Sequence, residues 1–195
     1  NTVAEVGGAR LYAWVTTLYL VGSVVAATLV NPILVRAGPR SSYLFGLGVF
    51  GAASLVCAAA PDMGVLIAGR ALQGVAGGLL AGLGYAVINA ALPRALWTRG
   101  SAVVSAMWGV ATVVGPATGG LFAQFGLWRW AFVTMAVLSA LMAALVPAAV
   151  VAGRADPDEA SPMLKVPVLK VPVRSLLLLG AAALAVSVAQ IPRDV

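Results

Sequence analysis

Long apolar runs separated by short polar connections dominate this chain of 195 residues and constrain its fold more than any other feature. A helix that crosses a lipid bilayer needs about 20 mostly apolar residues. The composition agrees with a membrane protein, because 62% of the residues are hydrophobic, 9% are charged and the mean hydropathy is +1.02. We expect six membrane spans, at Tyr12–Ile33, Tyr43–Ala60, Val65–Leu92, Ala102–Phe125, Trp130–Val151 and Leu176–Ile191.

The expected fold follows from the lack of water in the bilayer, where backbone groups must pair within the protein and only helices or closed barrels can span. The apolar runs show no period-two alternation of the kind that barrel strands need. The sequence therefore predicts an all-α fold, a polytopic transmembrane helical bundle of about six spans. We expect three parts, with bundle spans in 1–152, a cytoplasmic linker rich in proline and charge in 153–174, and a further, truncated span in 175–195.

The basic residues fall between the spans instead of forming one face, so the net charge of +6 does not indicate a nucleic-acid partner. By the positive-inside rule, the connections that carry them are cytoplasmic. We expect a multi-pass protein of the cell membrane, specifically of a bacterial inner membrane. The basic residues of the alternate connections are Arg36, Arg40, Arg94, Arg99, Arg154, Lys165, Lys170 and Arg174.

Residues that usually carry catalysis are missing from the spans. The chain has no histidine, and its single cysteine, Cys57, lies in an apolar segment typical of a small core residue. No acid pair or activated nucleophile occurs in a span. We therefore predict no enzymatic activity, no cofactor and no metal site.

Arg70 is the only charged residue in the apolar run Gly64–Leu92. An arginine at membrane depth costs roughly 2.5 to 3.5 kcal/mol on insertion scales, so it should face the bundle interior or a wet cavity. Gln73, three residues later, lies close enough on a helix to share that polar environment. The same helical face carries small residues that let helices approach closely, namely Gly74, Gly77 and Gly78.

Pro116 lies inside the fourth expected span, in the segment VVGPATGG. A proline within a helix removes a backbone donor and clashes with the carbonyl four residues earlier. With its neighbouring glycines it predicts either a static kink or a hinge at a close helix contact. Those glycines are Gly115, Gly119 and Gly120.

These segments, in their order, resemble the major facilitator superfamily. The fourth-span signature of that family's exporters resembles Leu66, Arg70, Gln73 and Gly74. The fifth-span signature of its antiporter branch resembles Gly115, Pro116, Gly119 and Gly120, with Ala111 where the family has a glycine. The segment WRWAF from Trp128 and the opening GGARLYAW resemble drug and proton antiporters with fourteen spans.

The resemblance implies an exporter of drugs or other amphipathic molecules that works by proton antiport and alternating access, with this chain covering spans two to six and lacking the first. Arg70 and Gln73 would serve coupling, and the Pro116 segment would serve gating. Arginine stays protonated at physiological pH, so the proton carrier would be an acid elsewhere. The implied partners are a small-molecule substrate, protons, the lipid bilayer and the remainder of the polypeptide.

The connection after the first expected span matches the family's loop pattern only in part. Arg36, Gly38 and Arg40 fit the pattern, whereas Val35 replaces the aspartate that helps to lock the cytoplasmic side in the family. The arginines therefore serve either gating or simple positive-inside orientation.

Two alternatives stay open, and the departures together with the absence of acids in the spans favour the first of them. The chain would be a non-transporting membrane scaffold or a decayed fragment, or an uptake carrier of the same superfamily. Polar residues farther along the helix of Arg70, Tyr85 and Asn89, are candidates for lining a substrate path. Trp14 and Tyr19 are predicted to anchor one end of the first span at the membrane interface.

Overall fold

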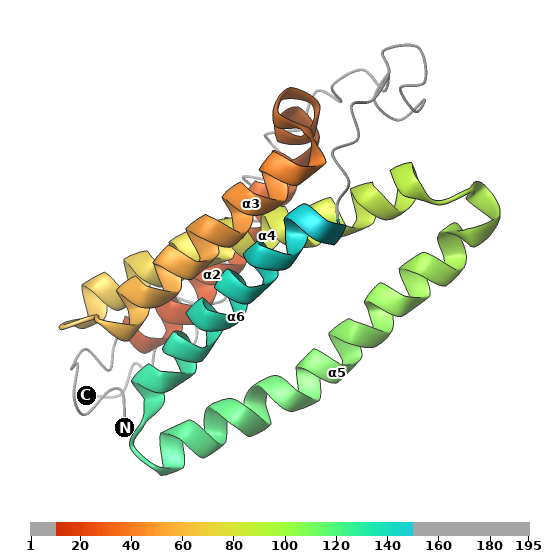
Figure 1. The fold of residues 1–195 in the computed structure, drawn as a ribbon. Coiled ribbons are helices and arrows are strands. Elements are labelled where there is room, and N and C mark those ends of the chain that lie inside the picture. The colour runs from red at the N-terminus through yellow and green to blue at the C-terminus, as the bar shows by residue number, and fades with distance from the viewer. Residues whose placement is uncertain (1–10, 150–195) are drawn as a thin grey trace.

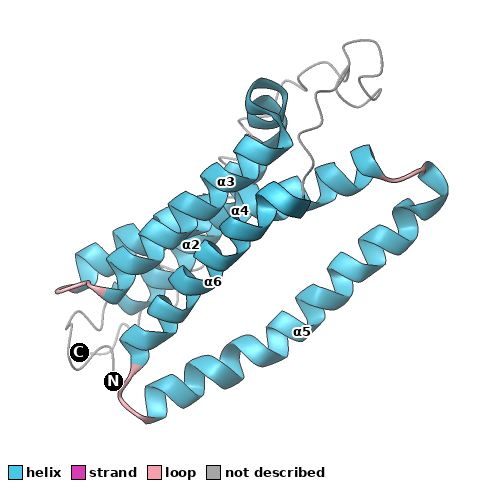
Figure 2. Ribbon diagram, in the orientation of Figure 1, coloured by secondary structure: helices cyan, strands magenta, loops and turns pink. Residues whose placement is uncertain are grey.

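The computed structural model describes residues 11–149, and these residues form helices joined by short turns (Figure 1, Figure 2). The all-α prediction is confirmed for this part of the chain. The predicted linker at 153–174 and the predicted span Leu176–Ile191 lie outside the described residues. The helices are α2 (Tyr12–Ala27), α3 (Val30–Ala58), α4 (Met63–Ala91), the short 3-10 helix η2 (Arg94–Leu96), α5 (Trp97–Gln124) and α6 (Trp128–Ala149).

Four of these helices are long and apolar enough to cross a membrane, and α2 adds a shorter apolar helix. The first predicted span, Tyr12–Ile33, is divided between α2 and the beginning of α3, because the helix breaks at Thr28 and Leu29. The protein is thus a multi-pass membrane protein. Among residues 11–149 the helices follow the predicted spans, and in this part of the chain only the first span is interrupted.

The helix α3 kinks at Gly38, which has φ 74° and ψ 167°. This backbone conformation is open almost only to glycine. Ser42 is fully buried and donates a hydrogen bond of 2.6 Å to the carbonyl oxygen of Gly38, which fixes the turn. The connection predicted around Gly38 and Pro39 is therefore a sharp kink within α3.

Four helices pack together: α2 lies on α4, and α3 packs against both α4 and α6. Glycines make this close packing possible. A Cβ atom at Gly74 or Gly78 would fall on the backbone of Tyr19 or Ser23 in α2. We call α2, α3, α4 and α6 the packed bundle.

The remaining long helix, α5, stands apart from the packed bundle and meets the other helices only near its two ends (Figure 1). It contains no buried residue. Large apolar side chains along it are exposed, including Val113, which is 71% exposed. Sequence hydropathy therefore identified this span but not its distance from its neighbours.

Two polar contacts fix one end of the packed bundle. The Asp62 carboxylate caps α4 by accepting a hydrogen bond of 3.0 Å from the backbone N–H of Val65. Arg129, at the start of α6, donates hydrogen bonds to the carbonyl oxygens of Ala58 (2.7 Å) and Ala60 (2.9 Å). These carbonyls lie where α3 ends, so Arg129 joins α6 to α3.

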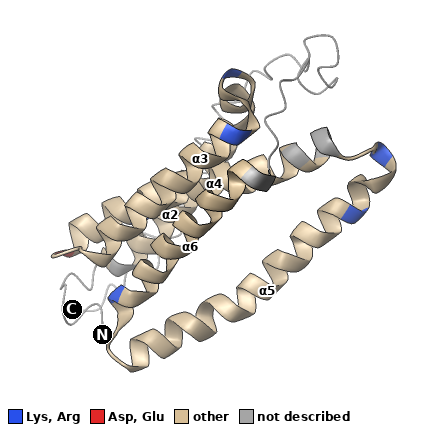
Figure 3. Ribbon diagram, viewed as in Figure 1, with Lys and Arg blue, Asp and Glu red and all other residues tan. Residues whose placement is uncertain are grey.

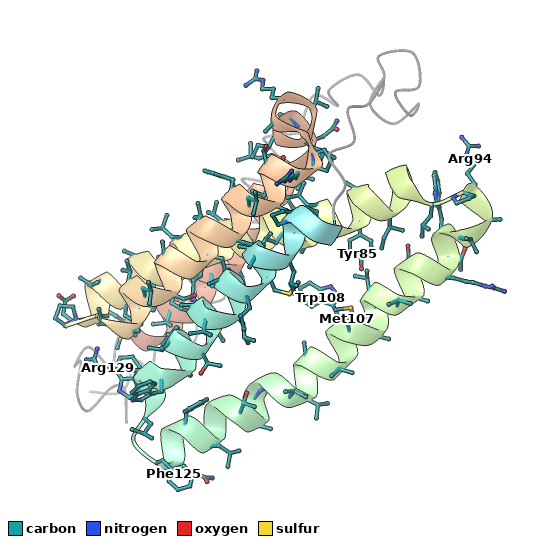
Figure 4. The ribbon with its side chains drawn as sticks, viewed as in Figure 1. Tyr85, Arg94, Met107, Trp108, Phe125 and Arg129 are labelled. Atoms are coloured by element: carbon teal, nitrogen blue, oxygen red, sulfur yellow. The ribbon has the colours of Figure 1, made fainter. Side chains whose placement is uncertain are left out.

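The basic residues visible in Figure 3 lie at the ends of the helices. Figure 4 places Arg94 and Arg129 beyond opposite ends of α5. Arg94 belongs to the connection that the positive-inside rule assigns to the cytoplasm, and Arg129 belongs to a connection on the other side. The structure therefore separates these two connections as the expected topology requires.

Candidate functional site

Arg70 lies on the face of α4 that meets α2, and its side chain is partly buried. The guanidinium carbon lies 4.5 Å from the centroid of the Tyr19 ring. One guanidinium nitrogen donates a hydrogen bond of 3.0 Å to Oε1 of Gln73. Its charge thus meets an aromatic face on α2 and an amide oxygen on its own helix.

Gln73 continues the hydrogen bonding from α4 to α3. Its side chain is 0% exposed, and Nε2 donates a hydrogen bond of 2.7 Å to Oγ of Ser54. Ser54 in turn donates to the carbonyl oxygen of Phe50 at 2.7 Å, and the thiol of Cys57 lies 3.7 Å from Oε1 of Gln73. We call the side chains that connect α2, α3 and α4 the arginine network: Tyr19, Ser54, Cys57, Arg70 and Gln73.

Glycines bring the helices of the arginine network together. Gly69 faces the sulfur of Cys57, from which a Cβ atom would lie only 2.6 Å away. Gly74 lies against the backbone of Tyr19, and a Cβ atom at Gly77 would lie 3.0 Å from the Tyr19 hydroxyl. The predicted row of small residues is therefore the surface on which α2 rests, and it places the Tyr19 ring beside Arg70.

The Pro116 segment lies on α5, away from the arginine network. The helix runs without interruption through Pro116. A Cβ atom at Gly115, Gly119 or Gly120 would meet no atom within 4 Å in the part of the chain that the structure describes. The hydroxyl of Thr118 returns to its own helix, donating to the carbonyl oxygen of Val114 at 2.8 Å.

The loop motif also lies away from the arginine network. Arg36 and Arg40 are exposed on either side of the kink at Gly38. Val35, in place of the family's aspartate, is exposed as well, at 52%. The structure thus separates the predicted motif residues into one buried cluster and two exposed segments.

Tyr85 is 38% exposed on α4. In Figure 4 it lies on the stretch of α4 that faces α5, across from Met107 and Trp108, which are 66% and 56% exposed. Asn89 belongs to the same helix, but its side chain is outside the described part of the structure. Tyr85 is therefore accessible, as a residue along a substrate path must be.

Three members of the arginine network were missed by sequence reasoning. Tyr19 was expected to anchor the first span at the membrane interface; in the structure its ring packs against Arg70 and its backbone against Gly74. Cys57 is buried as expected, but it also contacts Gln73. The available signal for Ser54 was its helical spacing from Cys57, which places two small polar side chains on one face.

The network contains a fixed positive charge and no carboxylate. Asp62 is the single acidic residue among residues 11–149, and it is exposed at the start of α4. No group of three or more His, Cys, Asp or Glu side chains comes together among the residues that the structure describes. The Arg70 guanidinium can attract and orient an anionic group, but an arginine stays protonated near neutral pH and cannot itself carry protons.

Membrane-crossing helices, close glycine contacts and a partly buried arginine together describe a polytopic helical membrane protein. The chain matches the Major Facilitator Superfamily over residues 3–191. It therefore belongs to that superfamily.

Relatives in this superfamily include proteins named for multidrug transport or multidrug efflux. Over 192 residues the chain is 70% identical to a protein of Mycobacterium tuberculosis named probable multidrug-efflux transporter, covering 98% of this chain and 40% of the relative. It is 33% identical over 130 residues to the multidrug transporter protein MdtP of Bacillus subtilis, covering 67% of this chain and 24% of the relative. The chain thus spans well under half the length of these relatives.

Proposed function

We propose that this chain is part of a secondary active transporter that exports drugs or other amphipathic small molecules by proton antiport. The high identity to the M. tuberculosis relative, whose name states multidrug efflux, supports the direction and the substrate class. Transport would proceed by alternating access between two helical bundles around a site near the membrane midplane. Such a protein acts on no covalent bond of its substrate, so we propose that it is not an enzyme.

The observation that carries this proposal is the partly buried Arg70 and its contacts. A charge in a membrane helix is costly, and a scaffold that only packs helices has no use for it. The guanidinium has several N–H donors, of which one is bonded to Gln73 among the described residues. Its other donors are free to hold a carboxylate from the rest of the polypeptide, and a nearby positive charge favours the ionised form of such an acid.

Protons would therefore be carried by that acid, whereas Arg70 sets when the acid releases its proton. Gln73 holds the arginine, and the Pro116 segment of α5 would contribute to gating. The substrate path would pass Tyr85 and Asn89. The other partners would be the lipid bilayer and the remainder of the polypeptide, with no role for nucleic acid.

Proton-driven efflux by the complete transporter tests this function. Arg70→Ala should abolish accumulation of a fluorescent cationic dye in everted vesicles while the amount of protein in the membrane stays the same. Arg70→Lys should lower the rate strongly as well, because an ammonium does not present the planar donor set of a guanidinium. Dye fluorescence after acidification of the vesicle interior gives the rate.

Arg99→Ala is the matched control, because Arg99 is an exposed arginine near the start of α5. It should leave the rate within about twofold of the parent protein, consistent with a surface substitution. Unchanged efflux in Arg70→Ala would contradict the coupling role. No efflux by the parent protein would favour the scaffold alternative, and accumulation in the opposite direction would favour an uptake carrier.

A further inference from the structure

The orientation of the Gln73 amide is set by a serine on another helix. Ser54 donates its hydroxyl proton to the carbonyl oxygen of Phe50 at 2.7 Å, so its oxygen can only accept a further hydrogen bond. Gln73 must then turn its NH2 group toward Ser54, at 2.7 Å. Its carbonyl oxygen is left to face Arg70, at 3.0 Å.

The opposite orientation of this amide would place NH2 donors against the guanidinium, which is itself only a donor. It would also turn the Gln73 carbonyl oxygen toward the Ser54 oxygen, whose proton is already donated to Phe50, so two acceptors would face each other at a fully buried position. The Ser54 hydroxyl therefore determines whether Arg70 has an acceptor on α4. Ser54 itself does not contact the arginine, so its effect is indirect.

The aromatic ring of Tyr19 holds the guanidinium from the side of α2. The guanidinium carbon lies 4.5 Å from the ring centroid, within the range of a cation–π contact. The backbone of Tyr19 packs directly on Gly74, which fixes the place from which the ring reaches the guanidinium. It is the ring face, not the hydroxyl group, that meets the charge.

We propose that Tyr19 and Ser54 are positioning residues for Arg70, which together hold its guanidinium at one place between α2, α3 and α4. Tyr19 restrains the arginine directly, and Ser54 does so through Gln73. This inference rests on the proposed function, because it assigns these residues to the coupling role of Arg70. Loss of either restraint leaves the charge present but no longer fixed, so substrate would still cross the membrane while proton coupling weakens.

Two transport modes of the complete protein in proteoliposomes test this inference. Downhill exchange of the fluorescent cationic dye needs an intact fold and substrate site. Uphill accumulation of the dye, driven by a pH gradient, also needs coupling to protons. Tyr19→Leu should reduce uphill accumulation at least tenfold and leave downhill exchange within about twofold. Tyr19→Phe keeps the ring face and should restore uphill accumulation to the parent value. A merely structural role would lower both modes together.

Ser54→Ala, which removes only the hydroxyl oxygen, is the second variant. It keeps the inference testable if Tyr19→Leu does not reach the membrane. It should lower uphill accumulation severalfold with downhill exchange unchanged. Parent-like uphill accumulation in either Tyr19→Leu or Ser54→Ala, measured beside an inactive Arg70→Ala, would overturn the positioning role alone. Parent-like accumulation in Arg70→Ala would overturn the proposed function and this inference with it.

Discussion

The packed bundle and α5 contain similar residues but differ in how those residues are used. In α4, glycines spaced four apart lie directly on the backbone of α2. In α5, Gly115 and Gly119 have the same spacing, and no described atom lies within 4 Å of a Cβ atom at either position. A row of small residues therefore permits a close helix contact but does not say which helix makes it.

The comparison also separates two kinds of polar residue. Gln73 and Ser54 are buried in the packed bundle, and their mutual hydrogen bond joins α4 to α3. Thr112 and Thr118 on α5 bond only to carbonyl oxygens of their own helix. We therefore expect substitutions in the packed bundle to change stability, and substitutions in α5 to act through its contacts with the rest of the polypeptide.

The largest effect on stability is expected for Gly78→Ala, because the added methyl group would fall on the backbone of Ser23. Backbone cannot move aside as a flexible side chain does, so the cost should be about 3 kcal/mol, the upper end for overpacking. The midpoint of denaturation of the purified protein in detergent measures it. Gly48→Ala is the control, since nothing lies within 4 Å of a Cβ atom there. Equal midpoints for the two variants would show that α2 and α4 are farther apart than described.

A smaller loss is expected for Arg129→Ala, which removes the hydrogen bonds from α6 to the carbonyl oxygens of Ala58 and Ala60. These carbonyls lie near an end of the packed bundle, where water can replace part of the interaction. The expected cost is about 2 kcal/mol, in the range for hydrogen bonds to charged groups. The same denaturation measurement applies. Arg99→Ala, on the exposed start of α5, should change the midpoint little. A larger loss for Arg99→Ala than for Arg129→Ala would contradict the claim that polar contacts stabilise the packed bundle more than α5.

The smallest effect is expected at the kink in α3. Ser42→Ala removes the hydrogen bond of 2.6 Å to the carbonyl oxygen of Gly38 at a fully buried position. The loss should be about 1 kcal/mol, the usual net value of one hydrogen bond. Ser41→Ala is the matched control, because Ser41 is the adjacent serine and its own side chain is exposed. A parent-like midpoint for Ser42→Ala would mean that Gly38 holds the turn without this contact.

Local features of the fold could be predicted from the sequence because they depend on hydropathy and on backbone chemistry. The apolar runs predicted the spans among residues 11–149, and the connection predicted between the first two contains the kink at Gly38. The break at Thr28 was not predicted, because neither it nor Leu29 disfavours a helix strongly.

The candidate site was predictable only in part, for a physical reason. Arg70 and Gln73 are neighbours on one helix, so their proximity follows from helical geometry. Tyr19 and Ser54 come from other helices, and their contacts depend on how α2 and α3 rotate and slide against α4. No local pattern fixes that rotation, and for the same reason the separation of α5 could not be read from its apolar sequence.

Disulfide cross-linking in the complete, membrane-embedded protein tests most directly the claim that α6 packs on α3 while α5 stands apart. A Cβ atom at Gly51 would lie 3.5 Å from the Cβ of Ser139, which suits a disulfide. With Cys57 and any other native cysteine replaced by serine, G51C/S139C should form a disulfide under mild oxidation. G115C/S139C, with both positions about three helical turns from the α5–α6 connection, should form none. A disulfide in G115C/S139C and none in G51C/S139C would contradict the account.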